Sequence, residues 1–138
     1  MTTPERRRFT ARLAEFDAIA EFIESACANM KDEERLRIVL IVEELFANSV
    51  NHGYAGDSNQ PVWLALSVNE EDCHLVYEDC APEYDPFASV DMSSTEADVD
   101  TRRVGGLGIV LLVELSSSRS YRRRGTHNVV DLRIPHKK

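Results

Sequence analysis

Hydrophobic residues recur at helical spacing in two stretches near the start of the chain. The first stretch runs from Ala14 to about Met30, and the second from about Glu33 to His52. Asp32 is expected to cap the second helix, because its carboxylate can accept hydrogen bonds from the free N–H groups of the first turn. Gly53 is expected to end that helix, since glycine is the usual residue just beyond a helix C-terminus.

An alternating pattern, in which successive side chains would point to opposite faces, predicts strands over much of the remaining chain. The pattern is weak at 5–13 and strong at Pro61–Val68, and 73–79 forms the return strand of a hairpin. A glycine turn at 105–108 leads into a short apolar helix that ends near 115. The last segment, 116–134, is expected to hold two strands joined at its Arg-Gly turn.

The order of these elements predicts the fold class. It reads strand, two helices, hairpin, a long polar loop at 80–104, helix and hairpin. Hairpins make antiparallel neighbours, so we expect an α+β protein: a two-layer α/β sandwich with helices on one face of a mixed, mostly antiparallel sheet. Residues 1–138 are expected to form a single domain.

Composition and charge narrow the functional classes. The chain is 43% hydrophobic and 29% charged, with a formal net charge of −8, which argues against a general nucleic-acid-binding role. The aliphatic run Ile38–Val42 is far shorter than a membrane span. We therefore expect a cytoplasmic protein with no membrane and no direct nucleic-acid partner. For the arginines at 119 and 122–124, we favour the interpretation of a solvated strand face over that of a docking patch.

Three cysteines, Cys27, Cys73 and Cys80, show no C-x-x-C spacing. A metal site formed by Cys73, His74 and Cys80 is conceivable. Neighbouring residues of a strand point to opposite faces, however, so Cys73 and His74 would not converge. The spacing therefore favours reduced, structural thiols.

The second predicted helix carries a polar stripe beside its core-facing residues. At about 100° per residue, five residues share one arc and should face the core: Ile38, Val42, Leu45, Phe46 and Ser49. Glu44, Asn48, Asn51 and His52 form a separate stripe. One interpretation of this stripe is a solvated polar face.

The stripe is also compatible with a binding site. Leu40 and Ile41 lie on it one turn upstream, and it lacks the Lys and Arg that usually pair with exposed Glu. A carboxylate and a carboxamide one turn apart suit a hard cation or an ordered water molecule. Spacing alone leaves both interpretations open.

Two further features bear on whether the stripe belongs to a binding site. Asp79 stands at the exit of a strand, where its carboxylate can accept a hydrogen bond from a ligand's amino group. Gly105, Gly106 and Gly108 lie just before or within the first turn of a helix. Such glycines allow close approach of phosphate to free N–H groups, although they also suit a simple tight loop.

Four segments together resemble a known family. "EELFANSVNHGY" (43–54), "EDCAPEYDPF" (78–87), "GGLGI" (105–109) and "YRRRGTHNVVDLRI" (121–134) resemble the motifs of the Bergerat-fold ATPases, in order and over nearly the whole chain. The closest resemblance is to the anti-sigma-factor serine/threonine kinases of bacterial partner-switching systems. No single motif is specific, but the joint pattern is.

The resemblance implies an ATP site with Mg²⁺. Glu44 corresponds to the general base that deprotonates the attacking hydroxyl, and Asn48 to the asparagine that ligates Mg²⁺. His52 and Gly53 correspond to the end of that motif, near the phosphates. Asp79 corresponds to the aspartate that reads the adenine amino group.

Further nucleotide-binding positions follow from the same resemblance. The phosphate-binding turn corresponds to Gly105, Gly106, Leu107, Gly108 and Ile109, at the end of an ATP lid at 87–104. Arg103 could reach the γ-phosphate, or could be a solvated lid charge. Thr126 corresponds to a threonine close to adenine. Ala81 stands where the family usually has the glycine of an Asp-x-Gly motif.

The function implied is that of an anti-sigma factor with ATP-dependent serine/threonine kinase activity. It would phosphorylate an anti-sigma-factor antagonist, hold a sigma factor in the other partner state, and form a homodimer. The alanine at 81 favours an alternative, a binding module that senses ATP, or does without it, and has no kinase turnover. A third alternative is a histidine-kinase catalytic domain acting on a histidine of another chain.

Overall fold

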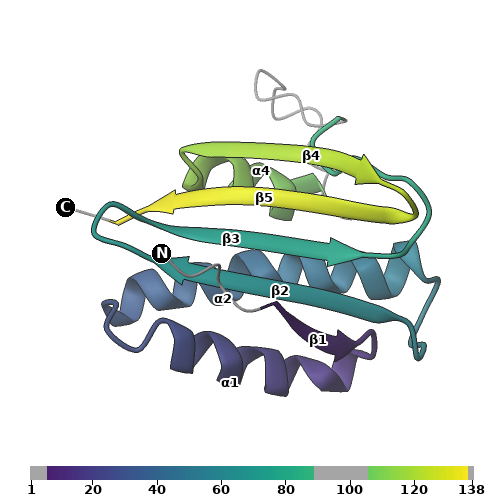
Figure 1. Cartoon of the computed structure of the whole chain (residues 1–138), viewed down its shortest axis with the longest axis horizontal. Helices are drawn as coiled ribbons and strands as arrows, with labels where there is room; N and C mark the ends of the chain where they lie inside the picture. Colours follow the sequence, from purple (N-terminus) through teal and green to yellow (C-terminus); the bar gives the residue numbers. More distant parts are fainter. Residues whose placement is uncertain (1–5, 89–105, 137–138) are drawn as a thin grey trace.

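The computed structural model describes residues 6–88 and 106–136, which build a five-stranded sheet backed by helices (Figure 1). The sheet order is β1-β2-β3-β5-β4. The strands are β1 (Arg7–Thr10), β2 (Pro61–Val68), β3 (Asp72–Asp79), β4 (Ser118–Arg124) and β5 (His127–Pro135). All four neighbouring pairs of described strands are antiparallel. The prediction of a mostly antiparallel sheet is therefore confirmed, and the described strands include no parallel pair.

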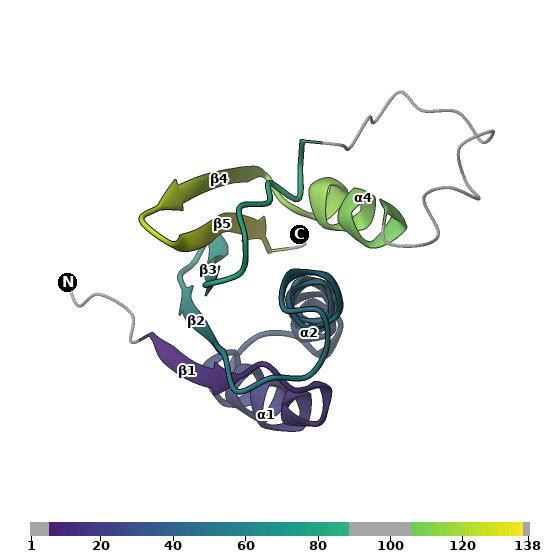
Figure 2. The ribbon, with the colours of Figure 1, turned by 90° about the vertical axis from the view of Figure 1, so that its right-hand side faces the viewer.

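The helices all lie on one side of the sheet and leave its other face bare, as Figure 2 shows. They are α1 (Phe16–Ala26), preceded by the 3₁₀ turn η1 (Leu13–Glu15); α2 (Asp32–Asn48), continued by the π-helical turn η2 (Ser49–Gly53); and α4 (Gly106–Leu115). This arrangement confirms the predicted two-layer α/β sandwich. Among the described residues, no helix is long and apolar enough to cross a bilayer.

The junction between α1 and α2 differs from the sequence-based expectation. Helix α1 ends at Ala26, before the expected end near Met30, and the N-cap of α2 is Lys31 while Asp32 is already helical. Arg35 explains both differences. Its guanidinium donates to the Met30 carbonyl oxygen at 2.6 Å and pairs with the Asp32 carboxylate, so that carboxylate does not cap the helix.

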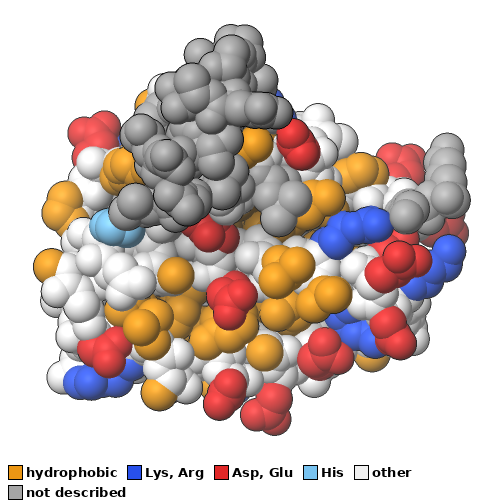
Figure 3. Space-filling model, turned by 180° about the vertical axis from the view of Figure 1, so that it is seen from behind, with side chains coloured by type: hydrophobic (Ala, Val, Ile, Leu, Met, Phe, Trp, Pro, Cys, Tyr) orange, Lys and Arg blue, Asp and Glu red, His pale blue; other side chains and the backbone are white. Residues whose placement is uncertain are grey.

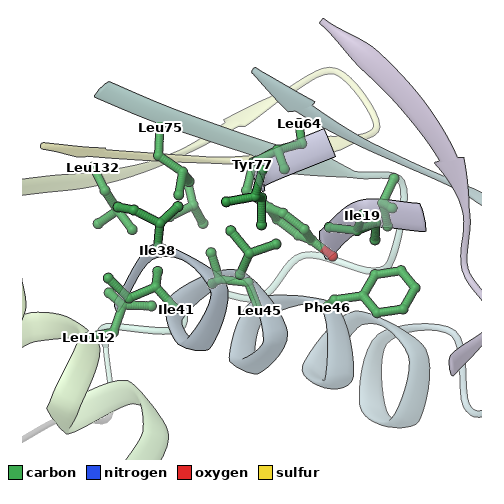
Figure 4. Close-up of a cluster of buried hydrophobic side chains, with 14 of the residues drawn as sticks. Ile19, Ile38, Ile41, Leu45, Phe46, Leu64, Leu75, Tyr77, Leu112 and Leu132 are labelled. Carbon is green, nitrogen blue, oxygen red and sulfur yellow. The ribbon is translucent and has the colours of Figure 1, made fainter. Parts of the chain in front are cut away.

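The core lies between α2 and the inner face of the sheet (Figure 4). Helix α2 directs Ile38 and Leu45 toward the sheet, where Leu75 and Tyr77 of β3 lie, while Phe46 lies beside Ile19 of α1. The five residues predicted to face the core are all buried: Ile38, Val42, Leu45, Phe46 and Ser49. That prediction is therefore confirmed, and it orients the polar stripe of α2 away from the sheet.

The face of the sheet opposite the helices carries a buried carboxylate that pairs with two arginines and a histidine. Glu78 accepts hydrogen bonds from Arg6 at 2.9 Å and Arg124 at 3.3 Å, and it also pairs with His127. The ring of His127 stacks on Trp63 with a centroid separation of 5.0 Å. Arg119, Arg122 and Arg124 of β4 are exposed, as expected for a solvated strand face, and Arg124 also pairs with Glu78 in this cluster.

Candidate functional site

Helices α2 and α4 meet where Glu44 packs against Gly108. Glu44 lies on the polar stripe of α2, and Gly108 lies in the first turn of α4. A Cβ atom on Gly108 would overlap the Glu44 carboxyl group, so the carboxyl group occupies the space that the missing side chain leaves. The structure thereby brings together two motifs that are far apart in the sequence.

The environment of Glu44 favours its protonated form. The side chain is half-buried, and burial raises the pKa of Glu44 above the ordinary range of a carboxyl group; the neighbouring charge of Glu43 acts in the same direction. A hydrogen bond from Asn48 and the proximity of His52 oppose the shift. A carboxylate whose pKa is raised toward neutrality is a better proton acceptor, which suits a general base.

Asn48 is placed to hold a cation. Its side-chain amide lies close enough to Glu44, one turn earlier, to lower the pKa of that carboxyl group. The carbonyl oxygen of the same amide is a hard ligand of the kind that Mg²⁺ prefers. Among the described residues, no group of three or more His, Cys, Asp and Glu side chains could hold a metal ion. Mg²⁺ at a nucleotide typically takes one or two protein ligands and completes its octahedron with phosphates and water, so the residues present fit such an ion.

The other residues of this motif lie farther along the same segment. His52 and Gly53 are part of the π-helical turn η2, where His52 is exposed and Gly53 is half-buried. π-Helical turns inside helices are uncommon and occur often at functional sites. Here the turn follows directly on Asn48 and aims Ser49 into the core.

Asp79 is buried at the end of β3 with three protein donors around its carboxylate. The Ser49 hydroxyl donates to Oδ2 at 2.6 Å, while the Asn128 amide donates to Oδ1 at 2.8 Å and the Ala81 N–H at 3.1 Å. A carboxylate offers about four lone-pair positions, so one acceptor position remains. This arrangement fits an aspartate that accepts one further hydrogen bond from a ligand's amino group.

The residue that reaches Asp79 from β5 is Asn128, which the sequence analysis missed. The β3–β5 register places these two residues opposite each other. Thr126, which the resemblance places close to the adenine, is exposed in the β4–β5 turn. Its role at the adenine stays a prediction. A signal was available in the sequence, since Asn128 continues the inward-facing series of Val130 and Leu132.

Asn128 also holds the chain segment that follows Asp79. Its amide nitrogen donates to the carbonyl oxygens of Ala81 and Pro82, both at 3.1 Å. Its carbonyl oxygen accepts from the backbone N–H of Tyr84 at 3.1 Å and from the Arg123 guanidinium at 3.1 Å. All its polar atoms are thus used within the protein, which makes Asn128 a positioning residue.

Two tyrosines complete this polar network, and both were also missed. The Tyr77 hydroxyl donates to the Ser49 oxygen at 2.7 Å, and burial raises the pKa of Tyr77 well above its ordinary value. The Tyr54 hydroxyl accepts the Cys80 N–H at 2.7 Å and donates to the Pro61 carbonyl oxygen at 2.7 Å. These bonds tie the end of β3 to the end of the α2 segment.

Ala81, which replaces the usual glycine of the family motif, faces Gly53. A Cβ on Gly53 would lie 2.7 Å from the Ala81 Cβ, and Ala81 is 2% exposed. The only described non-glycine residue with a positive φ is Ala55, so the backbone at Ala81 needs no glycine. The methyl group is accommodated because the residue opposite it has no side chain.

The predicted phosphate-binding turn is placed in part. Gly106, Leu107, Gly108 and Ile109 form the first turn of α4, and the Ile109 side chain is buried, which leaves the backbone as the group that could meet a phosphate. Free N–H groups at a helix N-terminus attract anions. The remaining predicted ligands of this region, Arg103 and Gly105, lie outside the described residues.

The cysteines agree with the expectation of free thiols. Cys27 and Cys73 are buried, Cys80 is half-buried, and none of them forms a disulfide.

Comparison with known proteins establishes the family. The model of the histidine kinase-like ATPase domain matches residues 9–134. The chain therefore belongs to the histidine kinase-like ATPase family, and membership in this family implies ATP binding. The alanine at 81 does not remove the chain from that family. None of the curated proteins matches the chain significantly.

Solved structures with the same fold include proteins from three bacteria. The RsbU and RsbW domains of Rv1364c from Mycobacterium tuberculosis align with a TM-score of 0.64 and 15% identity, covering 99% of this chain and 34% of that chain. A blue-light activated histidine kinase from Erythrobacter litoralis gives 0.56 and 23%, covering 89% and 41%. The Acinetobacter baumannii histidine kinase AdeS gives 0.50 and 18%, covering 99% and 70%. This chain thus spans about a third of the mycobacterial chain, and the likeness concerns the fold.

Proposed function

We propose that the protein is an anti-sigma factor that uses ATP to phosphorylate a serine or threonine of an anti-sigma-factor antagonist. The observation that carries the proposal is the packing of Glu44 against Gly108. It sets a carboxylate with a raised pKa beside the helix turn expected to bind phosphate, in a family that binds ATP. A base next to a γ-phosphate can activate a hydroxyl for phosphoryl transfer.

Each part of the site has a role in this proposal. Asp79, held by Ser49 and Asn128, accepts a hydrogen bond from the adenine amino group. The N–H groups in the first turn of α4 bind the phosphates. Asn48 offers its carbonyl oxygen to Mg²⁺, which would neutralise phosphate charge when bound. His52 and Gly53, with the unplaced Arg103 and Gly105, are proposed to border the phosphates.

The proposed reaction needs one proton transfer from this chain. Glu44 takes the proton of the acceptor hydroxyl as the hydroxyl oxygen forms a bond to the γ-phosphorus, and the bond from that phosphorus to the departing ADP oxygen breaks. The products are ADP and a phosphoserine or phosphothreonine. Because Glu44 is already ordered against α4, it requires no rearrangement to reach the phosphate end of the site.

Two further lines support the partner-switching role. The segments around Glu44, Asp79 and Gly108 resemble the motifs of anti-sigma-factor kinases, and one of the solved structures with this fold contains an RsbW domain. In keeping with that resemblance, we propose that the unphosphorylated antagonist competes with a sigma factor for a homodimer of this cytoplasmic, single-domain protein.

A labelling experiment tests the proposal. The protein is incubated with Mg²⁺, ATP labelled at the γ-phosphate, and each purified antagonist encoded in the source genome. We expect label in at least one antagonist, a loss of about 10²-fold or more in Glu44→Gln, and a strong loss in Asn48→Ala. Glu33→Gln, an exposed change in the first turn of α2, is the matched control. Full transfer by Glu44→Gln and Asn48→Ala would contradict the assignment.

The second candidate function is a binding module without turnover, favoured by the alanine at position 81. Calorimetry together with the labelling experiment separates the two functions. A binding module would bind Mg-ATP, or would bind its partner in the absence of ATP, and in either case it would transfer no label. The acid stability of any phosphoprotein separates both from a histidine-kinase domain. Phosphohistidine is lost in acid, whereas phosphoserine and phosphothreonine survive.

A further inference from the structure

An open groove runs along the outer side of α2, on the helix face of the molecule. Its apolar wall is formed by Leu13 of η1, Phe16 of α1 and Leu40 of α2, and the hollow encloses about 430 Å³. Leu13 is 47% exposed and Leu40 is 41% exposed. Figure 3 shows hydrophobic side chains gathered on this face with acidic side chains among them.

The candidate base forms part of the groove. Glu44 is one of its lining residues, and the same carboxyl group packs against Gly108 in α4. A chain segment lying in the groove would therefore reach the Glu44 carboxylate from the side opposite α4. That is the side from which an acceptor hydroxyl must approach if the phosphate lies at the first turn of α4.

The charge of the groove favours a particular kind of occupant. Glu43 and Glu44 are its charged lining residues, Asn51 is its polar one, and no lysine or arginine lines it among the described residues. An apolar surface with an acidic rim suits a segment that combines a large apolar side chain with a basic one. A hollow of about 430 Å³ has room for a few side chains, which suits a short peptide segment.

We propose that this groove docks the phosphoacceptor segment of the protein substrate. An apolar side chain beside the acceptor serine or threonine inserts between Leu13, Phe16 and Leu40, a basic residue pairs with Glu43, and the hydroxyl reaches Glu44. This inference rests on the proposed kinase function and adds to it the surface that selects the substrate.

The test uses exposed positions, so that the variants fold. Leu40→Lys and Leu13→Lys place charge in the apolar wall, and Glu43→Lys reverses the charge of the rim. Leu36→Lys is the matched control, because Leu36 lies one turn before Leu40 on α2, is 55% exposed and does not line the groove. For each variant, steady-state transfer from Mg-ATP to the purified antagonist gives kcat and KM, and calorimetry gives the Kd for Mg-ATP.

We expect the KM for the antagonist to rise about tenfold or more in Leu40→Lys, Leu13→Lys and Glu43→Lys, as the loss of a buried apolar contact or a charge pair predicts. The Kd for Mg-ATP should stay within about twofold of the unmodified protein, and Leu36→Lys should change neither constant.

Each other outcome overturns the inference. An unchanged KM for the antagonist removes the groove from substrate docking while the kinase function stands. A matching loss of ATP affinity would show that the groove acts through the nucleotide site. Conversion of a dimer to a monomer by Leu40→Lys, measured by analytical ultracentrifugation, would assign the groove to a homodimer interface. If the unmodified protein labels no antagonist, the proposed function fails first and the inference fails with it.

Discussion

The carboxyl group of Glu44 occupies the space that a Cβ atom on Gly108 would need. The contact joins the polar stripe of α2 to the first turn of α4, two segments that meet only in the folded chain. It involves the far end of a flexible side chain, so a methyl group added at Gly108 would displace Glu44 without blocking the helices from packing. Position 108 therefore offers a way to move the candidate base without removing it.

We expect Gly108→Ala to reduce phosphoryl transfer by about tenfold or more, because the displaced Glu44 no longer faces the acceptor. The free energy of unfolding should change by about 1 kcal/mol or less, because two effects offset each other. Alanine stabilises helix α4 relative to glycine, whereas displacing the Glu44 carboxyl group destabilises the contact between the helices. Steady-state transfer and urea unfolding measure the two effects. In a Glu44→Ala background the added methyl meets no carboxyl group, so Gly108→Ala should have no further effect on transfer. An equal loss in both backgrounds would contradict the displacement.

The raised pKa of Glu44 predicts an unusual pH dependence of stability. Burial raises the pKa of Glu44 in the folded state above its value in the unfolded chain. Above the unfolded pKa, ionisation of Glu44 therefore favours the unfolded chain and lowers the free energy of unfolding. Glu44→Gln should therefore increase the free energy of unfolding at pH 7. The increase should disappear at a pH below the unfolded value of about 4.3. Urea unfolding of both proteins across this range measures it, and a gain that persists at low pH would point to another cause.

Ionisation of Glu78 should have the opposite effect. Burial alone would raise its pKa, but hydrogen bonds from His127 and Arg6 and the charge of Arg124 outweigh burial, so the pKa of Glu78 lies below its ordinary range. Its ionised form stabilises the fold above the unfolded pKa, and that contribution is lost as the pH falls through the folded pKa. Glu78→Gln should therefore destabilise the protein at pH 7 and approach the unmodified protein in acid, as measured by chemical unfolding.

Asn128 is predicted to control both stability and nucleotide affinity. Asn128→Ala removes one of the three donors to Asp79 and a donor to the carbonyls of Ala81 and Pro82, at a cost of about 3 kcal/mol, and should weaken ATP binding. Asn128→Asp is the sharper probe. It sets two buried carboxyl groups together and raises the pKa of the pair, so the loss of stability should be largest at neutral pH and shrink on acidification. A loss independent of pH would contradict the contact with Asp79.

The contact between Ala81 and Gly53 predicts a compensating pair. Gly53→Ala should destabilise the protein by about 1–3 kcal/mol, because its methyl group would lie 2.7 Å from that of Ala81. Adding Ala81→Gly restores a single methyl group in the contact and should recover most of the loss. Thermal unfolding of the two single variants and the double variant measures the coupling. Simple additivity would show that the methyl groups do not meet.

The sequence predicted those parts of the site that depend on local periodicity. Glu44 and Asn48 lie one helical turn apart, so the spacing alone placed them on one stripe, and the glycines at 106 and 108 were located at the start of a helix. The α1–α2 boundary was placed less well, because Arg35 binds carbonyls of the preceding turn through tertiary contacts that periodicity does not report.

The parts that depend on how distant segments align could not be predicted in the same way. Asn128 reaches Asp79 only through the β3–β5 register, which the sequence does not reveal. Ser49 was expected in the core but not as a donor to Asp79, because the π-helical turn that follows α2 leaves no clear mark in the sequence. The packing of Glu44 against Gly108 likewise required the relative placement of two helices.

The small gap shared by Gly53 and Ala81 should also shape how related sequences vary. It has room for one methyl group, contributed from either side: the end of the α2 segment or the segment after β3. Homologues that carry glycine at the position of Ala81 are thus free to carry alanine at the position of Gly53, whereas alanine at both positions should be avoided. The unusual Asp-Cys-Ala sequence is then tolerated because Gly53 leaves room for the one methyl group of Ala81, and the carboxylate beside it is unchanged.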